Sequence, residues 1–169
     1  MKIMATDVLV SVEEYLRTSY RPDCDYLDGE VVERNLGELE HSSAQREILL
    51  FLAMHYPHLR RRLLPEQRVQ VRWDRYRIPD ICVVASEIPR QKIITTPPDL
   101  CIEILSPEDT LTRTMDRIRD YFNMGVPTCW IIDPVSREAW VATPGHLDEV
   151  LDGILRASGI EMPLAEVLE

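Results

Sequence analysis

Residues 100–133 read LCIEILSPEDTLTRTMDRIRDYFNMGVPTCWIID, and this stretch decides the fold. The apolar runs at 100–105 and 128–133 are typical of buried strands. The segment 112–124 between them has helical spacing of its apolar residues. A strand, a helix and a strand in this order predict a βαβ unit with parallel strands and a right-handed crossover.

The helix predicted over residues 112–124 has one apolar side. Met115, Ile118 and Phe122 recur at spacings of three and four residues, which indicates the face that packs on the sheet. Gly125 follows directly and is typical of the residue that ends a helix in a left-handed backbone conformation.

The sequence around this unit predicts further short elements. Upstream, we expect a helix that begins with the capping box at 11–14 and runs to about Ser19, and then a hairpin over 26–32 around Asp28-Gly29. A helix over 40–56, which Pro57 ends, is expected next. It is followed by a half-buried strand over 68–73, with the Asp80 strand directly after it. Downstream, we expect a strand over 138–143 that pairs back on 128–133, and a last helix over 163–168.

Length and composition indicate a single domain over residues 1–169, because a chain with 45% hydrophobic residues can fill one core. The order of elements predicts an α/β fold, with an α+β character and a mixed sheet. No apolar run approaches the ~18 residues of a membrane span, so the expected location is the cytoplasm, without membrane contact.

The cysteines are interpreted as reduced residues of the core. Cys24, Cys82, Cys101 and Cys129 form no Cys-x-x-Cys pair, and three of them lie within predicted strands. This spacing favours neither a zinc site nor a disulfide.

The net charge of −10 argues against a protein that binds nucleic acid over its whole surface. The charge is uneven, because residues 60–77 contain seven arginines against Glu66 and Asp74. Two interpretations stay open for this stretch: a local patch that faces phosphate groups, or a solvated face whose arginines pair with acidic residues.

Two apolar runs each contain one carboxylate: Asp80 within 78–84 and Glu103 within 100–105. A charge among aliphatic residues costs several kcal/mol unless a partner or a metal compensates it. If the two strands are neighbours, both carboxylates can converge on one divalent cation, as in a metal-dependent phosphodiesterase.

The sequence resembles the Uma-two family of predicted endonucleases, within the PD-(D/E)XK restriction-endonuclease-like superfamily. The resemblance spans roughly residues 12–141, and its motifs keep their order and approximate spacing. It rests on YLDGEVV at 26–32, His41 at a predicted helix start, PDI at 79–81, IEILSP at 102–107, Tyr121, GVP at 125–127 and WIIDP at 130–134.

The resemblance implies a restriction-endonuclease-like core with an N-terminal helix and β-hairpin, and a site for Mg²⁺ or Mn²⁺. It assigns Asp80 and Glu103 as ligands and makes the carbonyl of Ile104 a further oxygen ligand. His41 matches a family histidine that binds metal or the scissile phosphate, or else makes a hydrogen bond at the helix terminus. Asp28 and Glu30 also match, and Asp28 is interpreted as a turn residue.

The chain departs from the superfamily motif at the catalytic lysine, because Leu105 stands two residues after Glu103. The family carries that cation on the following helix, and counting back from Gly125 places Arg117 there. Arginine does not deprotonate, so Arg117 could stabilise charge on a phosphate but not act as a general base. Alternatively, Arg117 simply pairs with Glu103 and no metal binds.

These observations leave two functions open. The first is a metal-dependent endonuclease that hydrolyses DNA, with Asp80 and Glu103 on the cation and Arg117 and His41 at the phosphate. The second is a catalytically degenerate nuclease fold that serves as a binding or assembly module. By analogy with restriction enzymes we expect a homodimer. A Ser-His-Asp hydrolase is disfavoured because the sequence has no Gly-x-Ser-x-Gly motif.

Overall fold

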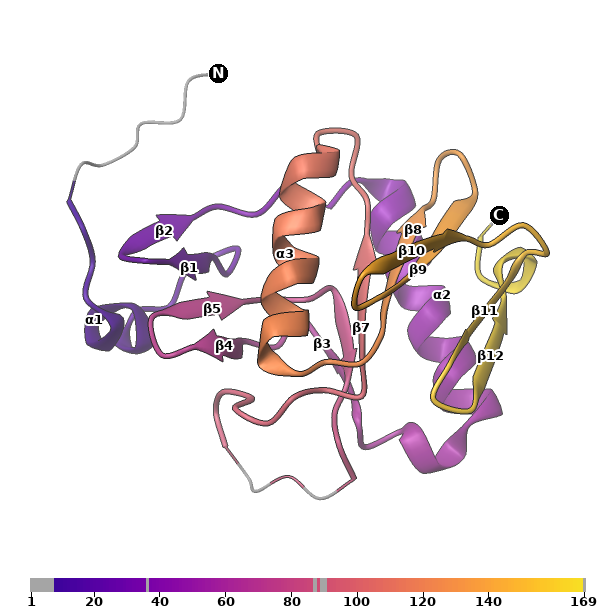
Figure 1. Ribbon diagram of the computed structural model, residues 1–169, viewed down its shortest axis with the longest axis horizontal. Helices are drawn as coiled ribbons and strands as arrows, with labels where there is room; N and C mark the ends of the chain where they lie inside the picture. The colour runs from indigo at the N-terminus through magenta and orange to yellow at the C-terminus, as the bar shows by residue number, and fades with distance from the viewer. Residues whose placement is uncertain (1–7, 36, 87, 89–90, 169) are drawn as a thin grey trace.

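The computed structural model describes residues 8–35, 37–86, 88 and 91–168 (Figure 1). Its largest sheet has six strands in the order β10-β9-β8-β7-β6-β3. These strands are β3 (Leu63–Pro65), β6 (Ile81–Val83), β7 (Leu100–Ile104), β8 (Cys129–Asp133), β9 (Glu138–Thr143) and β10 (His146–Glu149). The β7–β8 pair is parallel and the other pairs are antiparallel, so the sheet is mixed as expected.

The predicted βαβ unit is confirmed. Helix α3 (Leu111–Met124) connects β7 to its parallel neighbour β8. Gly125 ends the helix with φ 111°, a left-handed conformation that an L side chain adopts only under strain. The antiparallel return of β9 onto β8 is also as predicted.

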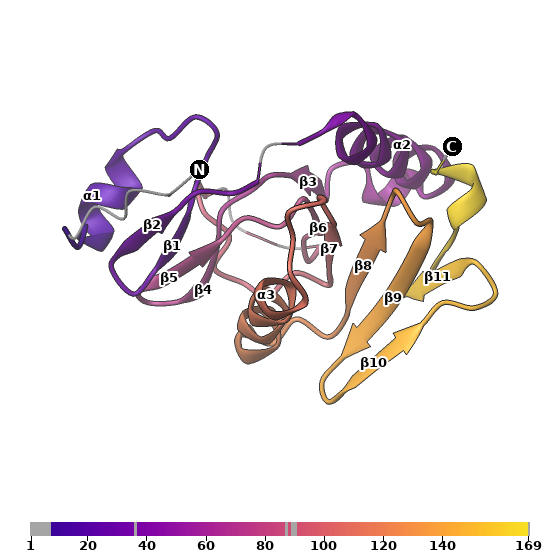
Figure 2. The same ribbon diagram turned by 90° about the horizontal axis from the view of Figure 1, so that it is seen from above.

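Helices α2 (Leu39–His55) and α3 cover opposite faces of the six-stranded sheet (Figure 2). Ala44, Ile48 and Leu52 of α2 pack on the face that contains Ile81 and Ile102. The alternation of side chains along a strand sends the residues between these to the α3 face. Glu103 follows Ile102 and therefore points toward α3.

The inner face of α3 differs from the prediction. Thr114, Ile118 and Tyr121 are its buried residues, while Met115 and Phe122 are only partly buried. Tyr121 and Thr114 carry hydroxyl groups, so an apolar pattern did not single them out. The helix is rotated toward Glu103, which needs polar partners in the interior.

A second sheet lies beside α3, with the order β2-β1-β5-β4 (Figure 1). Its strands are β1 (Asp25–Leu27), β2 (Glu30–Val32), β4 (Val69–Arg72) and β5 (Arg75–Arg77). The predicted hairpin is confirmed, with Asp28 and Gly29 at positive φ of 54° and 100°. Helix α1 (Val12–Arg17) packs on this sheet through Tyr15, which is fully buried.

Three further differences concern element boundaries. The prediction ran β4 directly into the Asp80 strand, but β5 intervenes and pairs with β4, because residues 73–74 form a turn. Helix α1 ends at Arg17, two residues before the predicted Ser19. The C-terminal region contains the strands β10, β11 (Ile154–Ala157) and β12 (Ile160–Pro163), and the predicted last helix is shortened to one 3₁₀ turn, η2 (Leu164–Glu166). A second 3₁₀ turn, η1 (Pro57–Leu59), follows α2.

The interpretation of the cysteines as core residues is confirmed, because Cys24, Cys82, Cys101 and Cys129 are all buried. In the described ranges, no helix combines the length and apolar character that crossing a bilayer requires.

Candidate functional site

Asp80 directly precedes β6 and is 3% exposed. Its Oδ1 accepts a hydrogen bond of 2.7 Å from Nη2 of Arg34 and lies 3.3 Å from Nε2 of His41. Its Oδ2 accepts one of 2.7 Å from the backbone N–H of Ile104. Both carboxylate oxygens are therefore engaged by protein donors.

The partners of Asp80 come from separate parts of the chain. His41 lies in the first turn of α2, and Gln45 follows one turn later. Because residues four apart share a helix face, Gln45 also reaches Asp80, donating 2.9 Å to its backbone carbonyl. Arg34 lies outside any helix or strand, in the segment between β2 and α2.

Glu103 lies within β7 and is 1% exposed. Its Oε2 accepts a hydrogen bond of 2.8 Å from Nη1 of Arg117, and its Oε1 accepts one of 2.6 Å from the Tyr121 hydroxyl. Arg117 and Tyr121 are four residues apart on α3, so one helix face supplies both donors. The proposed Arg117–Glu103 ion pair is thus present.

A third carboxylate, Asp109, joins the cluster from the loop before α3. It accepts a hydrogen bond of 2.9 Å from Nη2 of Arg117, and its side chain is 4% exposed. Asn35, next to Arg34, donates 3.2 Å to the same Asp109 oxygen. The segment at 34–35 therefore contacts both the Asp80 side and the Glu103 side of the cluster.

The sheet register explains why Asp80 and Glu103 meet. Ile81 pairs with Ile102 in the antiparallel β6–β7 ladder, so the next positions outward, Asp80 and Glu103, lie at the same end of that pair. The structure thus gathers Asp80, Glu103, Ile104, Arg117 and His41 into one cluster.

The two carboxyl groups differ in their pKa. Burial favours the neutral form of Asp80, but the His41 hydrogen bond and the Arg34 charge outweigh it and lower its pKa below the usual value. Burial also has the largest influence on the pKa of Glu103. It outweighs the opposing effect of the Arg117 charge, so the pKa of Glu103 is raised. Burial lowers the pKa of His41, but its interaction with Asp80 is stronger and the net pKa is raised.

The donor chemistry of the cluster fits a hard divalent cation, because its acidic groups offer oxygen atoms and no sulfur lies among them. Oδ2 of Asp80 and both oxygens of Glu103 each accept one hydrogen bond and retain a further lone pair, whereas Oδ1 of Asp80 faces both Arg34 and His41. Across the described ranges, no three His, Cys, Asp or Glu side chains are grouped as a metal site. The Ile104 carbonyl would thus be needed to complete a ligand set.

The arginine-rich stretch at 60–77 is largely paired with acidic residues. The pairs are Arg62–Asp99, Arg68–Asp23, Arg72 with Asp28 and Asp74, Arg75 with Asp28 and Asp120, and Arg77 with Asp25 and Asp120. This arrangement favours the ion-pair interpretation over a phosphate-facing patch. Asp28 serves in the hairpin turn and in these pairs, away from the cluster, and Glu30 is exposed.

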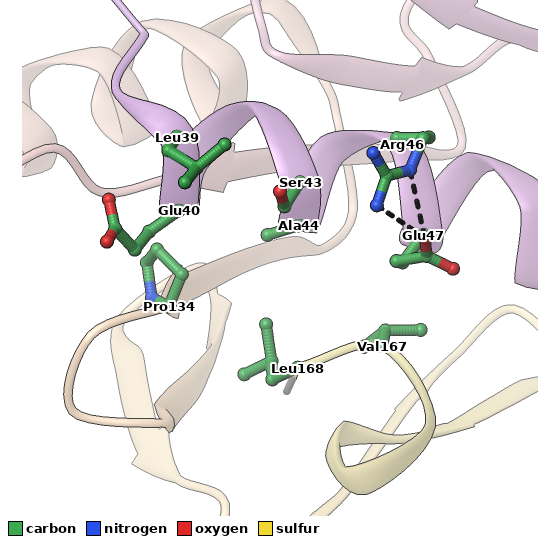
Figure 3. A pocket seen from close by; sticks show the side chains of 9 residues that line it. All are labelled: Leu39, Glu40, Ser43, Ala44, Arg46, Glu47, Pro134, Val167 and Leu168. Atoms are coloured by element: carbon green, nitrogen blue, oxygen red, sulfur yellow. Dashed lines mark hydrogen bonds and ion pairs between the residues drawn. The ribbon is translucent and has the colours of Figure 1, made fainter.

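A pocket lies along a different side of α2 (Figure 3). Its lining includes Leu39, Ser43 and Glu47 of α2 with Pro134 and Leu168. None of the residues that the sequence predicted for the site lines it. The concave surface is therefore separate from the buried charges.

Comparison with known proteins identifies the family of the chain. The model of the Uma2 family, described as "Putative restriction endonuclease", matches residues 12–160. The chain belongs to this family. No curated protein matches the sequence.

A solved structure similar to this Uma2 chain is that of a protein from Anabaena variabilis ATCC 29413, described as a putative nuclease. The two are 24% identical, and the match covers 94% of this chain and 97% of the other, with a TM-score of 0.79. The neighbour therefore supports the nuclease-like fold.

Sequence reasoning missed Arg34, Gln45 and Asp109, and it gave Tyr121 no role. The i, i+4 spacing of Gln45 from His41 and of Tyr121 from Arg117 is a signal that could have found two of them. Arg34 carries no such signal, because its partner Asp80 is 46 residues away.

Proposed function

We propose that this Uma2 chain is a divalent-metal-dependent endonuclease that hydrolyses phosphodiester bonds of DNA at the Asp80–Glu103 cluster. One observation carries the proposal. Two buried carboxylates, one directly before β6 and one within the neighbouring β7, each pair with an arginine, in a chain whose family is described as "Putative restriction endonuclease". Buried charge of this kind is costly and is concentrated at functional sites.

In this proposal Asp80, Glu103 and the Ile104 carbonyl hold Mg²⁺ or Mn²⁺. When bound, such a cation polarises a phosphoryl oxygen and lowers the pKa of water. Arg117 supplies positive charge to the phosphate, which gains negative charge during the displacement. It remains protonated throughout, so it acts as an electrostatic group and not as a base.

His41 has a defined part in this proposal. Its Nε2 faces Asp80, and its raised pKa favours the protonated ring. A protonated His41 fixes the orientation of the Asp80 carboxylate and adds positive charge next to the position of the phosphate. The side chain of His41 is restricted in its movement, because the residue is only 8% exposed.

A second function is favoured by a specific observation. Every oxygen of Asp80 and Glu103 already accepts a hydrogen bond from the protein, and Leu105 replaces the superfamily lysine. A cluster neutralised by its own arginines would stabilise the fold without a cation. The chain would then be a catalytically degenerate binding or assembly module.

Thermal unfolding with and without millimolar Mn²⁺ tests the two functions, on wild type, Asp80→Ala and Asp148→Asn. Asp148 is an exposed carboxylate of β10 and provides the matched control. A cation that binds only the folded state raises the melting temperature. We expect a rise for wild type and Asp148→Asn, none for Asp80→Ala, and the same pattern in the nicking of plasmid DNA.

Two outcomes would decide against the endonuclease. An Asp80→Ala protein that cleaves plasmid as fast as wild type would remove Asp80 from the reaction. A wild type that Mn²⁺ neither stabilises nor activates would favour the degenerate module. Circular dichroism of each variant confirms that a lost response reflects the site and not unfolding.

A further inference from the structure

Arg34 and His41 both face one carboxylate oxygen of Asp80, Oδ1. Its Nη2 donates 2.7 Å to Oδ1, and the same oxygen lies 3.3 Å from Nε2 of His41. A carboxylate oxygen accepts along two lone-pair directions, and both are directed at protein groups here. A cation that binds Oδ1 must therefore displace Arg34 or His41.

The two groups differ in how readily they can move. His41 is anchored in α2, whose next turn places Gln45 on the Asp80 carbonyl at 2.9 Å. Arg34 lies in a segment without helix or strand, and its side chain is 17% exposed against 10% for His41. An arginine side chain has several rotatable bonds, so its guanidinium can turn outward while the backbone stays in place.

The charges of the cluster favour an exchange over a simple addition. Arg34 and Arg117 oppose the carboxylates of Asp80, Glu103 and Asp109. If a divalent cation entered while both arginines stayed in place, the cluster of buried side chains would carry excess positive charge. A phosphodiester brings one negative charge per phosphate and would accept the hydrogen bonds of a displaced guanidinium.

We propose that Arg34 competes with the divalent cation for Asp80 and, once displaced, binds the phosphodiester of the substrate. This inference rests on the proposed nuclease function and adds a regulation of its site. Without DNA, Arg34 weakens cation binding. With DNA, the phosphate holds the guanidinium, so that DNA and cation each strengthen the binding of the other.

Calorimetric titration with Mn²⁺ alone tests the competition. The proteins are wild type, Arg34→Gln, Arg34→Met and the control Arg46→Gln, which alters an exposed arginine that pairs with Glu47 on α2. We expect both Arg34 variants to bind Mn²⁺ about 10-fold more tightly than wild type, within the usual range of coupling between sites. The control should match wild type.

The second measurement is the affinity for a short DNA duplex, by fluorescence anisotropy with Ca²⁺ as the cation, since Ca²⁺ also takes oxygen ligands. Loss of Arg34 should weaken duplex binding several-fold in Ca²⁺ and change it much less in EDTA. Arg34→Met serves if Arg34→Gln does not fold, because its unbranched side chain replaces the arginine stem.

The outcomes separate this inference from the proposed function. If wild type binds Mn²⁺ and the Arg34 variants bind it equally or more weakly, the competition is wrong and the metal site stands. If the variants bind Mn²⁺ more tightly but bind the duplex as well as wild type in Ca²⁺, the phosphate contact is wrong. If no protein binds Mn²⁺, the metal-dependent function and the inference both fail.

Discussion

The two carboxylates of the cluster are held in different ways. Glu103 receives both of its donors, Arg117 and Tyr121, from one face of α3. Asp80 is held by Arg34 from an irregular segment, by His41 from α2 and by a backbone N–H of β7. One half is thus built from a single rigid helix and the other from three separate parts of the chain.

This difference indicates which of the two arginines can be displaced from its carboxylate. Arg117 joins Glu103 to Asp109, so moving it would leave two buried carboxylates without a cation. Arg34 contacts one carboxylate and lies outside any helix or strand, while the two arginine side chains are about equally exposed, at 17% and 18%. The Glu103 half is therefore the fixed support of the site, and the Asp80 half is the part that can exchange partners.

The largest effect is expected from Arg117→Gln. It leaves Glu103 and Asp109, whose side chains are 1% and 4% exposed, without their shared guanidinium. Uncompensated buried charge costs 3–5 kcal/mol, so we expect a loss of about 4 kcal/mol in the free energy of unfolding, measured with urea. Arg119→Gln, an exposed arginine of the same helix, should change it by less than about 0.5 kcal/mol. A small effect of Arg117→Gln would show that α3 does not support the cluster electrostatically.

A smaller loss is expected from Asp80→Asn. The substitution removes the negative charge of the carboxylate that Arg34 and His41 contact. The pKa of Asp80 is lowered, so the fold favours the ionised form of this side chain. Arg34 can turn toward water, so we expect the free energy of unfolding to fall by about 3 kcal/mol, the lower end of the range for a broken buried ion pair. Urea unfolding checks this, with Asp148→Asn as the control. A loss larger than that of Arg117→Gln would reverse our comparison of the two halves.

Tyr121→Phe tests the helix side of Glu103 with the charges intact. It removes the hydroxyl that donates 2.6 Å to Oε1 while Arg117 remains on Oε2. A hydrogen bond to a charged group contributes about 1.5–3 kcal/mol, so we expect a loss of about 2 kcal/mol by urea unfolding. Tyr20→Phe, at a partly exposed tyrosine near α1, is the matched control. If both substitutions give the same small loss, the hydroxyl of Tyr121 contributes little to holding Glu103.

The sequence, through its family resemblance, predicted the Arg117–Glu103 pair but not the Arg34–Asp80 pair, and distance along the chain explains the difference. Glu103 and Arg117 are 14 residues apart within one βαβ unit, whose strand and helix periods are readable. Arg34 and Asp80 are 46 residues apart and meet only because two sheets and α2 come together. No local sequence pattern marks such a contact. Strand β5 was missed for a related reason, because its three residues are too few to show the alternation of polar and apolar side chains that identifies a strand.

The smallest change in stability is expected from Glu103→Gln. Burial raises the pKa of Glu103, so the fold disfavours its charged form, and Arg117 keeps Asp109 as a partner after the substitution. The glutamine also retains an oxygen that can accept from Tyr121. We therefore expect a loss of about 1 kcal/mol or less by urea unfolding.

In activity, the same substitution should have a large effect. If Glu103 holds the cation, the glutamine variant should nick plasmid at least about 100-fold more slowly than wild type while remaining folded. A folded Glu103→Gln protein with wild-type nicking would exclude Glu103 as a ligand. A variant that unfolds as readily as Arg117→Gln would instead show that the buried ion pair itself, and not Arg117 alone, supports the helix. Glu103→Gln thus separates the chemistry of the site from its stability more cleanly than Asp80→Asn, which is expected to lose both.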